Sequence, residues 1–577
     1  MKFWGVQPER WFPILSWSRH YRSEHLAADG LAAAIVTLML IPQSLAYALL
    51  AGVPPQAGLY ASMAPLVLYA LMGSSNTLAV GPAAVTSLMT AAAIGAVATQ
   101  GSASYAQAAV WLALLSGVMM LLMGAVRLGF VANFLSHPVI SGFVSASGLL
   151  IAASQLKHVL GVPLHGSTLW EVALELPHHL CHVHMPTFMM GVGMLVFLLW
   201  ARRRVKPLLQ HFGLSARAAD MAAKSAPVLA LLLSMALSWV FDLAAQGMKV
   251  VGHVPSGLPL VAWPSWDASS SAMVRDLWLP AVLISLVGFV ESVSVGQSLA
   301  ARRRERIDPD AELRALGLSN LGAGLTGGFP VTGGFSRSVV NFDAGARTPA
   351  AGILTAVGLA LAALYLTPAL YHLPQATLAA TIMVAVLTLV DFSAFARTWH
   401  YARADFAALT LTFGLTLAMG VEVGLPAGVL LSLLTLLYRT SRPHIATVGQ
   451  VPGTEHYRNV QRHAVQTHPH LLGVRVDESL YFANTRVLED YIATQVAANP
   501  GVRHVILQCT AVNDIDASAL ESLEAIHARL AASGVQLHLS EVKGPVMDRL
   551  NRSHFLQHLS GQVFLTHHQA VTSLSQT

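Results

Sequence analysis

The residue best placed to do chemistry in this sequence is an arginine, Arg337, that lies within a long apolar region. It belongs to the segment TGGFPVTGGFSRSVVN, residues 326–341, in which Gly and Pro interrupt any continuous helix. A charge at membrane depth is energetically expensive, so it is rare and usually functional. A broken helix at that depth is tolerated only where it is packed in protein or lines a cavity. The segment therefore predicts a binding site that contains a positive charge.

A counterpart, GSSNTLAVGPAAVTSLMT at residues 73–90, lies in the first half of the chain. Each segment reads as an extended stretch followed by a short helix, which we expect to begin at Pro82 in the first and near Phe335 in the second. Two helix N-termini would then face each other with free N–H groups and partial positive charge, which is an anion site. Ser336 adds a hydroxyl, and Arg337 adds forked donors suited to oxyanions. Paired broken segments of this kind are typical of a transporter, here one for anions.

Three further side chains complete the predicted site. Glu291 is the only carboxylate that we expect well inside a membrane span, where it either forms a structural ion pair with Arg337 or couples transport to protons. Gln43 is an amide near the membrane midplane that can donate to an oxyanion, and Tyr47 lies one turn later on the same helix face. The alternative for Gln43 is a hydrogen bond between helices.

The composition is that of a membrane protein with a soluble tail. Hydrophobic residues make up 54% of the 577 positions and charged residues only 11%, against roughly 25% charged in an ordinary soluble domain. Residues 1–444 carry a net charge of +7 and residues 445–577 a net charge of −2. We therefore expect a membrane domain over 1–444 and a small cytoplasmic domain over 445–577. The basic residues lie in short loops between apolar runs, which argues against nucleic-acid binding.

Fourteen apolar stretches are candidates for membrane spans, several of them short. They lie at residues 31–49, 58–72, 83–98, 107–125, 138–157, 186–201, 226–244, 277–300, 314–326, 335–346, 350–370, 376–391, 405–420 and 424–440. With both termini in the cytoplasm, 21 Lys and Arg lie in inside segments and three outside, as the positive-inside rule requires. The broken segments fall at spans three and ten, so seven spans plus seven would form two inverted repeats.

These residues resemble the SulP family of anion transporters, which includes sulfate permeases and the animal proteins prestin and pendrin. The resemblance rests on IPQSLAYALLAGVPPQAGLYAS, NTLAVGPAAVTSLM, GFVESVSVGQSLAARRRERIDPDAELRALGLSNL and GFPVTGGFSRSVVNFDAGARTP. It implies an all-α polytopic membrane fold of fourteen spans. In it, a core domain (about 31–125 and 277–370) moves as an elevator against a gate domain (about 138–244 and 376–440). It also implies a homodimer in a bacterial-type inner membrane, and a carrier rather than an enzyme.

The resemblance also assigns roles to individual residues. It implies that Gln43 and Tyr47 bind substrate from span one, that Ala83 opens the third span, and that Phe335, Ser336 and Arg337 form the span-ten site. Glu291 matches the acidic position of span eight, where Glu favours proton coupling. The expected function is proton-coupled sulfate symport, with bicarbonate or a C4-dicarboxylate as alternative substrates. An anion exchanger, a channel or sensor, and a nucleobase permease are the competing functions.

Residues 445–577 alternate between expected strands and helices, which predicts a small α/β domain. The expected strands lie at 471–477, 502–510 and 535–540, and the expected helices at 484–498, 516–533, 543–552 and near 567–574. The tail resembles the STAS domain, which typically ends SulP carriers and is shared with anti-sigma-factor antagonists. Asp516 is expected to cap a helix. Ala517 occupies the position that is a phosphorylated serine in the antagonists, so phosphorylation there is not expected. We expect Ser518 to be an ordinary helix-start residue, and the tail to serve folding, dimerisation or trafficking. Contact of the tail with a cytoplasmic partner is an alternative.

Few other residues in the sequence suggest a binding or catalytic role. The loop PHHLCHVH, residues 177–184, holds four His and one Cys, a composition that suits a transition metal, although a polar loop with chance histidines is the simpler interpretation. The sequence contains no P-loop and no catalytic triad that we recognise. We therefore expect no cofactor, no metal and secondary active transport.

Overall fold

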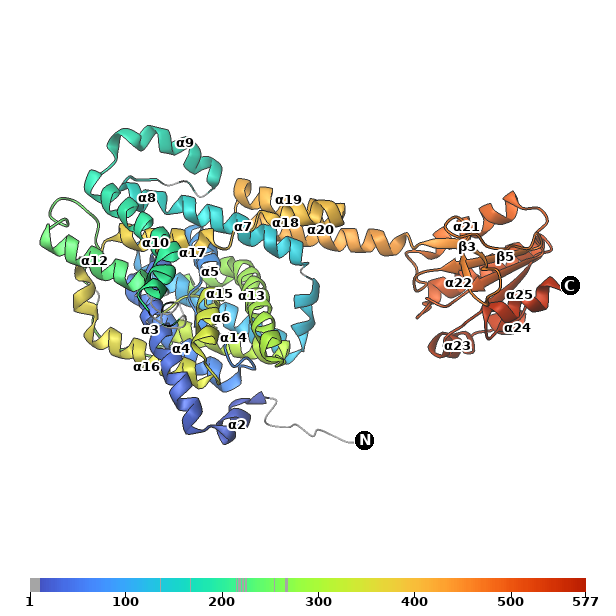
Figure 1. The fold of residues 1–577 in the computed structure, drawn as a ribbon, viewed down its shortest axis with the longest axis horizontal. Helices are drawn as coiled ribbons and strands as arrows, with labels where there is room; N and C mark the ends of the chain where they lie inside the picture. Colours follow the sequence, from blue (N-terminus) through green and yellow to red (C-terminus); the bar gives the residue numbers. More distant parts are fainter. Residues whose placement is uncertain are drawn as a thin grey trace. The chain divides into compact units, whose positions relative to one another are not determined.

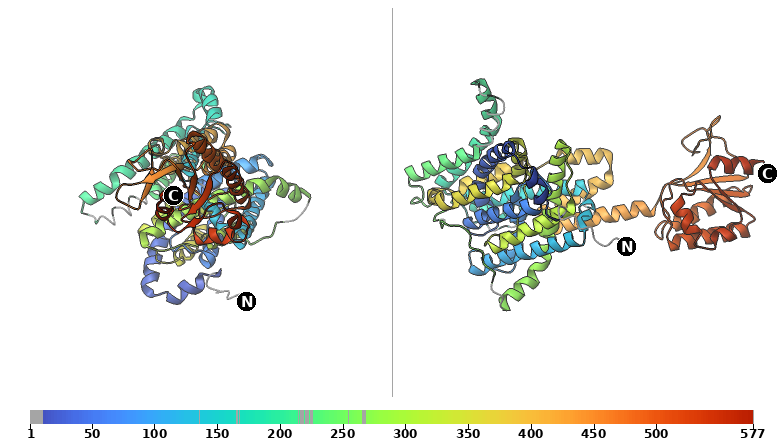
Figure 2. Two further views of the ribbon diagram at one scale, coloured as in Figure 1. Left: turned by 90° about the vertical axis from the view of Figure 1, so that its right-hand side faces the viewer. Right: turned by 90° about the horizontal axis from the view of Figure 1, so that it is seen from below.

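The computed structural model describes residues 11–576, apart from 135, 165, 167, 214, 216–218, 220–222, 224–225, 254 and 265–267. The chain forms two compact units, Met1–Ser432 and Leu433–Thr577. The first is a bundle of helices and the second is an α/β domain, as Figures 1 and 2 show. This division agrees in kind with the change of composition near residue 444.

A helix covers most of each of the fourteen apolar stretches that the sequence marks as spans. In chain order they are α3 (Ser23–Leu50), α4 (Pro55–Met72), α5 (Ala84–Gly95), α6 (Ala103–Ala125), α7 (His137–Ser154), α10 (Met185–His211), α12 (Ala226–Val240), α13 (Ala268–Arg303), α14 (Pro309–Leu325), α15 (Phe335–Ala344), α16 (Ala350–Tyr365), α17 (Gln375–Leu387), α19 (Arg403–Met419) and α20 (Val421–Ser441). Four shorter helices connect them or precede them: α2 (Ile14–Trp17), α8 (Leu156–Leu160), α9 (Leu169–His179) and α18 (Ser393–Tyr401).

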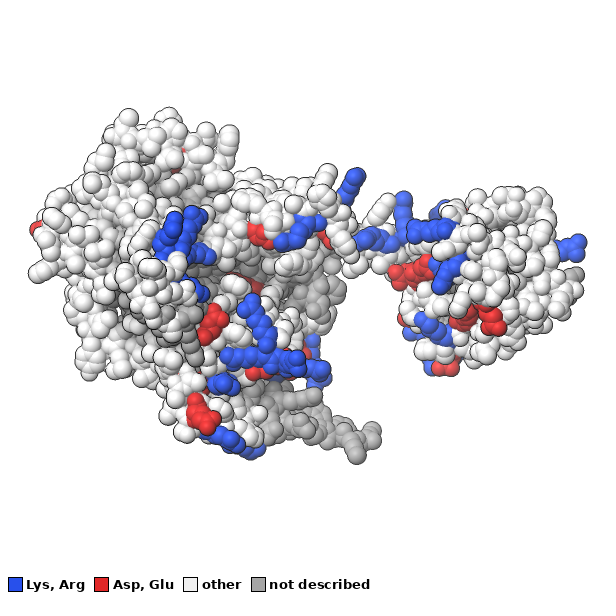
Figure 3. Space-filling model, in the orientation of Figure 1, with Lys and Arg blue, Asp and Glu red and all other residues white. Residues whose placement is uncertain are grey.

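Six of the described helices are long and apolar enough to cross a membrane on their own, and four shorter ones are also apolar. The six are Ser23–Leu50, Ala103–Ala125, His137–Leu160, Met185–His211, Ser270–Arg303 and Val423–Ser441. Figure 3 shows broad areas of the helical unit without Lys, Arg, Asp or Glu, as expected of a surface that faces lipid. The protein is therefore a multi-pass membrane protein, while fourteen crossings stays a prediction.

The two halves of the membrane unit pack against each other through small residues. Helices α6 and α14 meet at Gly117 and Gly317, where a Cβ atom added to either glycine would lie 2.8 Å from the carbonyl oxygen of the other. Small residues allow helix backbones to approach closely in membranes. The central packing of the bundle thus joins a helix from each expected repeat.

One buried carboxylate that the sequence reasoning missed is Glu312, in the first turn of α14. The span expected from the sequence begins at residue 314 and so leaves Glu312 outside it, whereas α14 begins at Pro309 and includes it. Glu312 is fully buried and accepts hydrogen bonds from the Tyr69 hydroxyl (2.8 Å), the Ser74 N–H and hydroxyl (2.9 and 2.7 Å) and the Ser75 N–H (3.2 Å). It therefore anchors the loop that leads toward α5.

We expect Glu312→Ala to destabilise the folded protein by about 2–5 kcal/mol, because four donors lose their acceptor in a buried place. The measurement is the unfolding transition of the purified full-length protein in detergent. Glu305→Ala is the matched control: Glu305 is exposed, accepts one hydrogen bond from Asn76 at 3.1 Å and should cost little. Equal stability of the two variants would contradict an anchoring role.

A second buried carboxylate, Asp29 of α3, holds the start of α16. Its Oδ1 accepts from the N–H groups of Arg347 (2.6 Å) and Thr348 (3.2 Å), and its Oδ2 accepts from the Thr348 hydroxyl (2.6 Å). Negative side chains stabilise the first turn of a helix in this way. Sequence alone gave no signal for this contact, because the partners are more than 300 residues apart.

The second unit contains a six-stranded sheet in the order β4-β3-β5-β6-β7-β8. The strands are β3 (Ile445–Gln450), β4 (Tyr457–Asn459), β5 (Leu471–Val476), β6 (His504–Gln508), β7 (Gln536–Ser540) and β8 (Val563–Phe564). Strands β5 to β8 are parallel, whereas β3 is antiparallel to both β4 and β5. The predicted strands at β5, β6 and β7 are confirmed, but β3, β4 and β8 were not predicted.

Helices cover both faces of this sheet. They are α21 (Thr485–Ala498), α22 (Ala517–Ala532), α23 (Gly544–Leu550), α24 (Phe555–His558) and α25 (His567–Ser575). The first four share one apolar core with the sheet, and α25 packs on the other face against Val448, Ile506 and Phe564. The predicted cap is confirmed, since the Asp516 carboxylate accepts the Ala519 N–H at 2.8 Å.

Three histidines lie on this sheet or against it, His504 in β6, His538 in β7 and His567 at the start of α25, and the last two are almost fully buried. His504 Nδ1 and His538 Nε2 are 3.2 Å apart, and His538 Nδ1 accepts the Gln562 N–H at 3.0 Å. His567 Nδ1 and the Ser540 hydroxyl are 2.9 Å apart. Burial and the neighbouring His504 lower the pKa of His538 to about 4, and burial lowers the pKa of His567 to about 4.

Because these folded-state pKa values lie below the unfolded value of about 6.5, stability from the neutral histidines is present above that pH and is lost as pH falls toward 4. We expect amide hydrogen exchange of β7 and β8 in the full-length protein, corrected for intrinsic rates, to rise over this window. His538→Gln cannot titrate and should flatten the rise. The exposed His456→Gln should leave it unchanged, and an equal effect of both variants would contradict the assignment.

Candidate functional site

The two broken segments meet at a pair of very short strands. Strand β1 (Val80–Gly81) pairs antiparallel with β2 (Thr332–Gly333) in the middle of the helical unit. Each strand leads into a short helix, β1 into α5 and β2 into α15. The second helix begins at Phe335, as predicted. The first begins two residues later than predicted, at Ala84 with Ala83 as N-cap, so Pro82 ends the extended stretch instead of opening the helix.

Both helix N-termini leave their first backbone N–H groups unpaired. Six such groups have no acceptor among the residues that the structure describes. They are the N–H groups of Ala84, Val85 and Thr86 in α5 and of Phe335, Ser336 and Arg337 in α15. Unpaired N–H groups and the positive ends of two helix dipoles make this region favourable for an anion.

Side chains from neighbouring helices hold the extended strand in place. The Asn320 side chain of α14 forms two hydrogen bonds of 2.9 Å with the backbone N–H and carbonyl of Val331. The Ser292 hydroxyl of α13 contacts the Thr332 hydroxyl (2.8 Å) and accepts the Gly333 N–H (2.8 Å). The positions of the two helix starts are therefore set by buried polar contacts as well as by apolar packing.

Arg337 is 2% exposed and uses most of its donors on the backbone. It donates to the carbonyl oxygens of Ala79 (2.7 Å), Gly81 (2.5 Å), Thr332 (2.6 Å) and Pro82. A guanidinium has five N–H donors, so these four contacts leave one. Arg337 therefore joins the two strands and supplies positive charge. The sequence instead predicts that its guanidinium N–H groups donate to the anion.

Glu291 of α13 lies on the same cavity as Arg337, but the two do not form an ion pair. No nitrogen–oxygen contact within 4.0 Å joins them in the described structure. The Glu291 Oε2 atom is buried and has no hydrogen-bond partner among the described residues. The structural alternative for Glu291, a direct ion pair with Arg337, is therefore absent from this conformation.

A cavity of about 460 Å³ opens in front of the two helix starts. One wall comes from α3, α5, α13 and α15, and the other from α10, α12 and α17. All seven predicted site residues line it: Gln43, Tyr47, Ala83, Glu291, Phe335, Ser336 and Arg337. Its volume is ample for a small oxyanion and its hydration water.

The predicted substrate-binding side chains differ in their hydrogen bonds and in their exposure. The side chains of Gln43, Tyr47 and Ser336 form no hydrogen bond with any described residue. Gln43 and Tyr47 are each 8% exposed, while Phe335 is 49% exposed. Ala83 is small and nearly buried at the N-cap of α5. The alternative for Gln43, a hydrogen bond between helices, is not seen in the described structure.

Two basic residues whose only predicted role is in the positive-inside count lie at the cavity, and a third lies at the C-terminal end of α15. Arg202 and Lys206 of α10 line the cavity. Arg303 of α13 donates to the carbonyl oxygens of Ala346 (2.5 Å) and Phe342 (3.3 Å) and lies 4.4 Å from the Phe342 ring, so it caps the C-terminal end of α15. The helical spacing of Arg202 and Lys206 was the signal that could have identified them as neighbours on one face.

The histidine-rich loop does not form a metal centre in the described residues, which contain no group of three or more His, Cys, Asp or Glu arranged to hold a metal ion. His184 instead contacts the Thr187 hydroxyl at 2.7 Å and the Gln246 carbonyl at 2.9 Å. Cys181 and Cys509 are both free.

Comparisons with known proteins agree with this architecture. Residues 26–412 match the profile described as "Sulfate permease family", and residues 462–570 match that of the STAS domain. The chain is 34% identical over 575 residues to "Sulfate transporter 4.1, chloroplastic" of Arabidopsis thaliana, covering 97% of this chain and 82% of that protein. It is 31% identical over 583 residues to "High affinity sulfate transporter 2" of Stylosanthes hamata, covering 97% and 86%.

Two solved structures share the fold. The murine Slc26a9 anion transporter in the inward-facing state superposes with a TM-score of 0.88 at 22% identity, covering 100% of this chain and 96% of that one. The transmembrane domain of the cyanobacterial bicarbonate transporter BicA gives a TM-score of 0.59 at 19% identity, covering 71% and 98%. The overall fold expected from the sequence is thereby confirmed.

Proposed function

Because the chain belongs to the sulfate permease family, we propose that it is a secondary active anion transporter, with sulfate as the first candidate substrate. The observation that carries the proposal is the pair of helix N-termini, α5 and α15, whose first residues line one cavity. Among the described residues there is no acceptor at this cavity for the N–H groups of Ala84, Val85, Phe335, Ser336 and Arg337. Free N–H groups and the positive end of the helix dipole make such termini favourable sites for anions. The family consists of transporters, so an enzymatic activity is not proposed.

In the proposed site the backbone coordinates the anion and a few side chains orient it. The N–H groups at the starts of α5 and α15 and the Ser336 hydroxyl donate to its oxygens. Gln43 and Tyr47 donate from α3, and Ala83 and Phe335 set the shape of the cavity. Arg337 contributes its positive charge and its remaining N–H group, and its hydrogen bonds hold the two strands in place. The charges of Arg202 and Lys206 raise the local concentration of anions.

The cavity lies between the two groups of helices that the elevator proposal treats as separate bodies. Helices α3, α5, α13 and α15 fall within the proposed core (about 31–125 and 277–370), and α10, α12 and α17 fall within the proposed gate (about 138–244 and 376–440). Movement of the core past the gate would carry the bound anion across the membrane. A homodimer in a bacterial-type inner membrane, with both termini cytoplasmic, is part of the same proposal.

Glu291 is the proposed coupling residue. Its buried oxygen has no partner in the described structure, so it is free to take up a proton when the anion binds. Proton uptake would reduce the net negative charge that moves with a divalent anion.

Bicarbonate is the second candidate substrate, because BicA, a bicarbonate transporter by name, has the same fold in its membrane domain. A C4-dicarboxylate is the third candidate. The test is uptake of labelled sulfate into proteoliposomes over a range of sulfate concentrations, with unlabelled bicarbonate or fumarate as competitor. A carrier for sulfate saturates and is competed only weakly by the other two. Linear, unsaturated flux would instead indicate a channel.

A further inference from the structure

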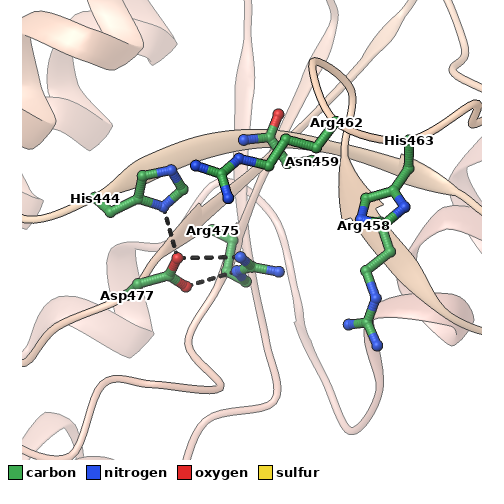
Figure 4. Close-up of a pocket in the computed structure, with 7 residues that line it drawn as sticks. All are labelled: His444, Arg458, Asn459, Arg462, His463, Arg475 and Asp477. Atoms are coloured by element: carbon green, nitrogen blue, oxygen red, sulfur yellow. Dashed lines mark hydrogen bonds and ion pairs between the residues drawn. The ribbon is translucent and has the colours of Figure 1, made fainter. Parts of the chain in front are cut away.

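The STAS unit contains a basic pocket that transport does not use. Its volume is about 360 Å³. It lies where β4, β3 and the end of β5 meet, as Figure 4 shows. The residues that line it are His444, Arg458, Asn459, Arg462, His463, Arg475 and Asp477.

One arginine of the pocket is held rigidly by the only carboxylate among these lining residues. Arg475 Nε and Nη2 donate to Asp477 Oδ1 (2.6 Å) and Oδ2 (3.0 Å), and His444 Nδ1 lies 2.7 Å from the same Oδ2. The Asp477 N–H in turn donates to the His444 carbonyl at 3.0 Å. The remaining nitrogen of Arg475, Nη1, has no partner in the described part of the chain. Arg475 is thus fixed in place with donors to spare.

A tight turn after β4 brings a second arginine over the first. The Asn459 side chain accepts the Gln461 N–H at 2.8 Å, and the Asn459 carbonyl accepts the N–H groups of Arg462 (3.1 Å) and His463 (3.2 Å). In Figure 4 the Arg462 guanidinium points toward His444 and Arg475. Neither its hydrogen bonds nor its charge is satisfied by any residue that the structure describes.

The charges of the pocket do not balance. Three arginines and one aspartate line the pocket. In Figure 4 the Arg458 guanidinium points away from Asp477, and Arg458 lacks an ion-pair partner among the described residues. Two guanidinium groups directed at one space repel each other unless an anion lies between them. Guanidinium groups match the geometry of phosphate and sulfate oxygens, and a doubly charged group of this kind would neutralise the excess. We propose that this pocket binds a phosphate or sulfate group, carried either by a lipid headgroup or by a soluble anion.

The pocket lies close in the chain to an apolar helix, so a lipid headgroup as well as a soluble anion can reach it. His444 follows the last residue of α20, Ser441, by three residues, so at most about 11 Å of backbone separates it from the end of that apolar helix. Arg439 and Arg442 lie on the same short stretch, and basic residues next to a span attract anionic lipids. This inference does not depend on what the transport cavity carries.

The test is hydrogen exchange of the full-length protein in nanodiscs, followed at the peptides that contain residues 444–463 and 471–477. The probes are phosphatidic acid added to phosphatidylcholine discs, and inorganic phosphate or sulfate added to plain phosphatidylcholine discs, with chloride at matched ionic strength as reference. We expect at least one probe to slow exchange at these peptides. Slowing by phosphatidic acid alone identifies a lipid, and slowing by the free ions identifies a soluble ligand.

Arg462→Gln is the informative variant, because Arg462 makes no side-chain contact that the fold would lose. It should abolish the slowing, whereas Arg552→Gln, an exposed arginine that does not line the pocket, should retain it. Absence of any slowing in the unaltered protein would overturn the proposal. Equal slowing in the Arg462→Gln variant would overturn it as well, because the ligand would then lie elsewhere.

Discussion

Arg337→Lys is expected to reduce anion uptake by about 100-fold, although lysine keeps the positive charge. An ammonium cannot reach the four carbonyl oxygens that the guanidinium joins across β1 and β2. Loss of two charge-assisted hydrogen bonds, at about 1.5 kcal/mol each, removes about 3 kcal/mol of the free energy that holds the two helix starts in place, which corresponds to about 100-fold in anion binding. Arg337→Ala removes the charge as well and should reduce uptake to background. The measurement is the initial rate of labelled sulfate uptake into proteoliposomes.

Arg347→Lys is the matched control for this prediction. Arg347 is exposed and follows α15, and only its backbone N–H makes a hydrogen bond that the structure records, to Asp29. It should transport at the rate of the unaltered protein. If Arg337→Lys also transports at that rate with the same apparent affinity, the fork of Arg337 is not needed and the role given to it is wrong.

Glu291→Gln is expected to abolish the acceleration of uptake by an inward proton gradient while leaving anion exchange intact. Gln has nearly the same shape but cannot take up the proton, and Glu291 has no ion pair that the change would break. The binding residues on α3, α5 and α15 are untouched, so counterflow of labelled against unlabelled anion should continue. The measurement is the ratio of uptake rates with and without the gradient, alongside counterflow at equal pH.

Glu305→Gln supplies the control, because Glu305 is exposed and its one recorded side-chain contact is with Asn76. It should respond to the gradient like the unaltered protein. Continued acceleration in the Glu291→Gln variant would show that another group carries the proton. Loss of both acceleration and counterflow would assign Glu291 to structure instead.

The start of α15 was predictable because local chemistry determines it. The run of Gly and Pro before Phe335 cannot continue a helix, so the start of α15 follows directly from sequence. The same reasoning misplaced α5, because proline favours the first helical turn but also suits the extended residue before an N-cap. All seven predicted site residues line one cavity, to which α3, α5, α13 and α15 contribute.

The contacts that hold the site together could not be predicted, because they join residues distant in sequence. Arg337 bonds to carbonyls more than 250 residues away, and Glu312 bonds to Tyr69 across 243 residues. Every residue has a backbone carbonyl, so the sequence does not show which arginines donate to one. From the sequence alone, Arg337 is therefore expected to be available to a ligand. Asn320 was missed for the same reason, since its partner is the backbone of Val331.

In the STAS unit, too, some elements could be predicted from the sequence and others could not. Strands β5, β6 and β7 were predicted because each is a run of apolar and β-branched residues between turns. The hairpin of β3 and β4 was missed because Tyr457–Asn459 is short, polar and stabilised mainly by pairing with β3. Strand β4 and the residues that flank this hairpin supply five of the seven lining residues of the basic pocket, namely His444, Arg458, Asn459, Arg462 and His463. The pocket therefore could not be predicted from the sequence either.

The central claim is that this chain carries an anion with protons through the cavity at α5 and α15. The most direct test is the accumulation of labelled sulfate in proteoliposomes whose lumen is more alkaline than the medium, with the membrane potential clamped at zero. We predict that sulfate rises above its external concentration and that a protonophore discharges it. Coupled transport would be contradicted if sulfate only reached its external concentration, at a rate that does not depend on the proton gradient. The choice of substrate would be contradicted if the gradient drove uptake of bicarbonate or fumarate but not of sulfate.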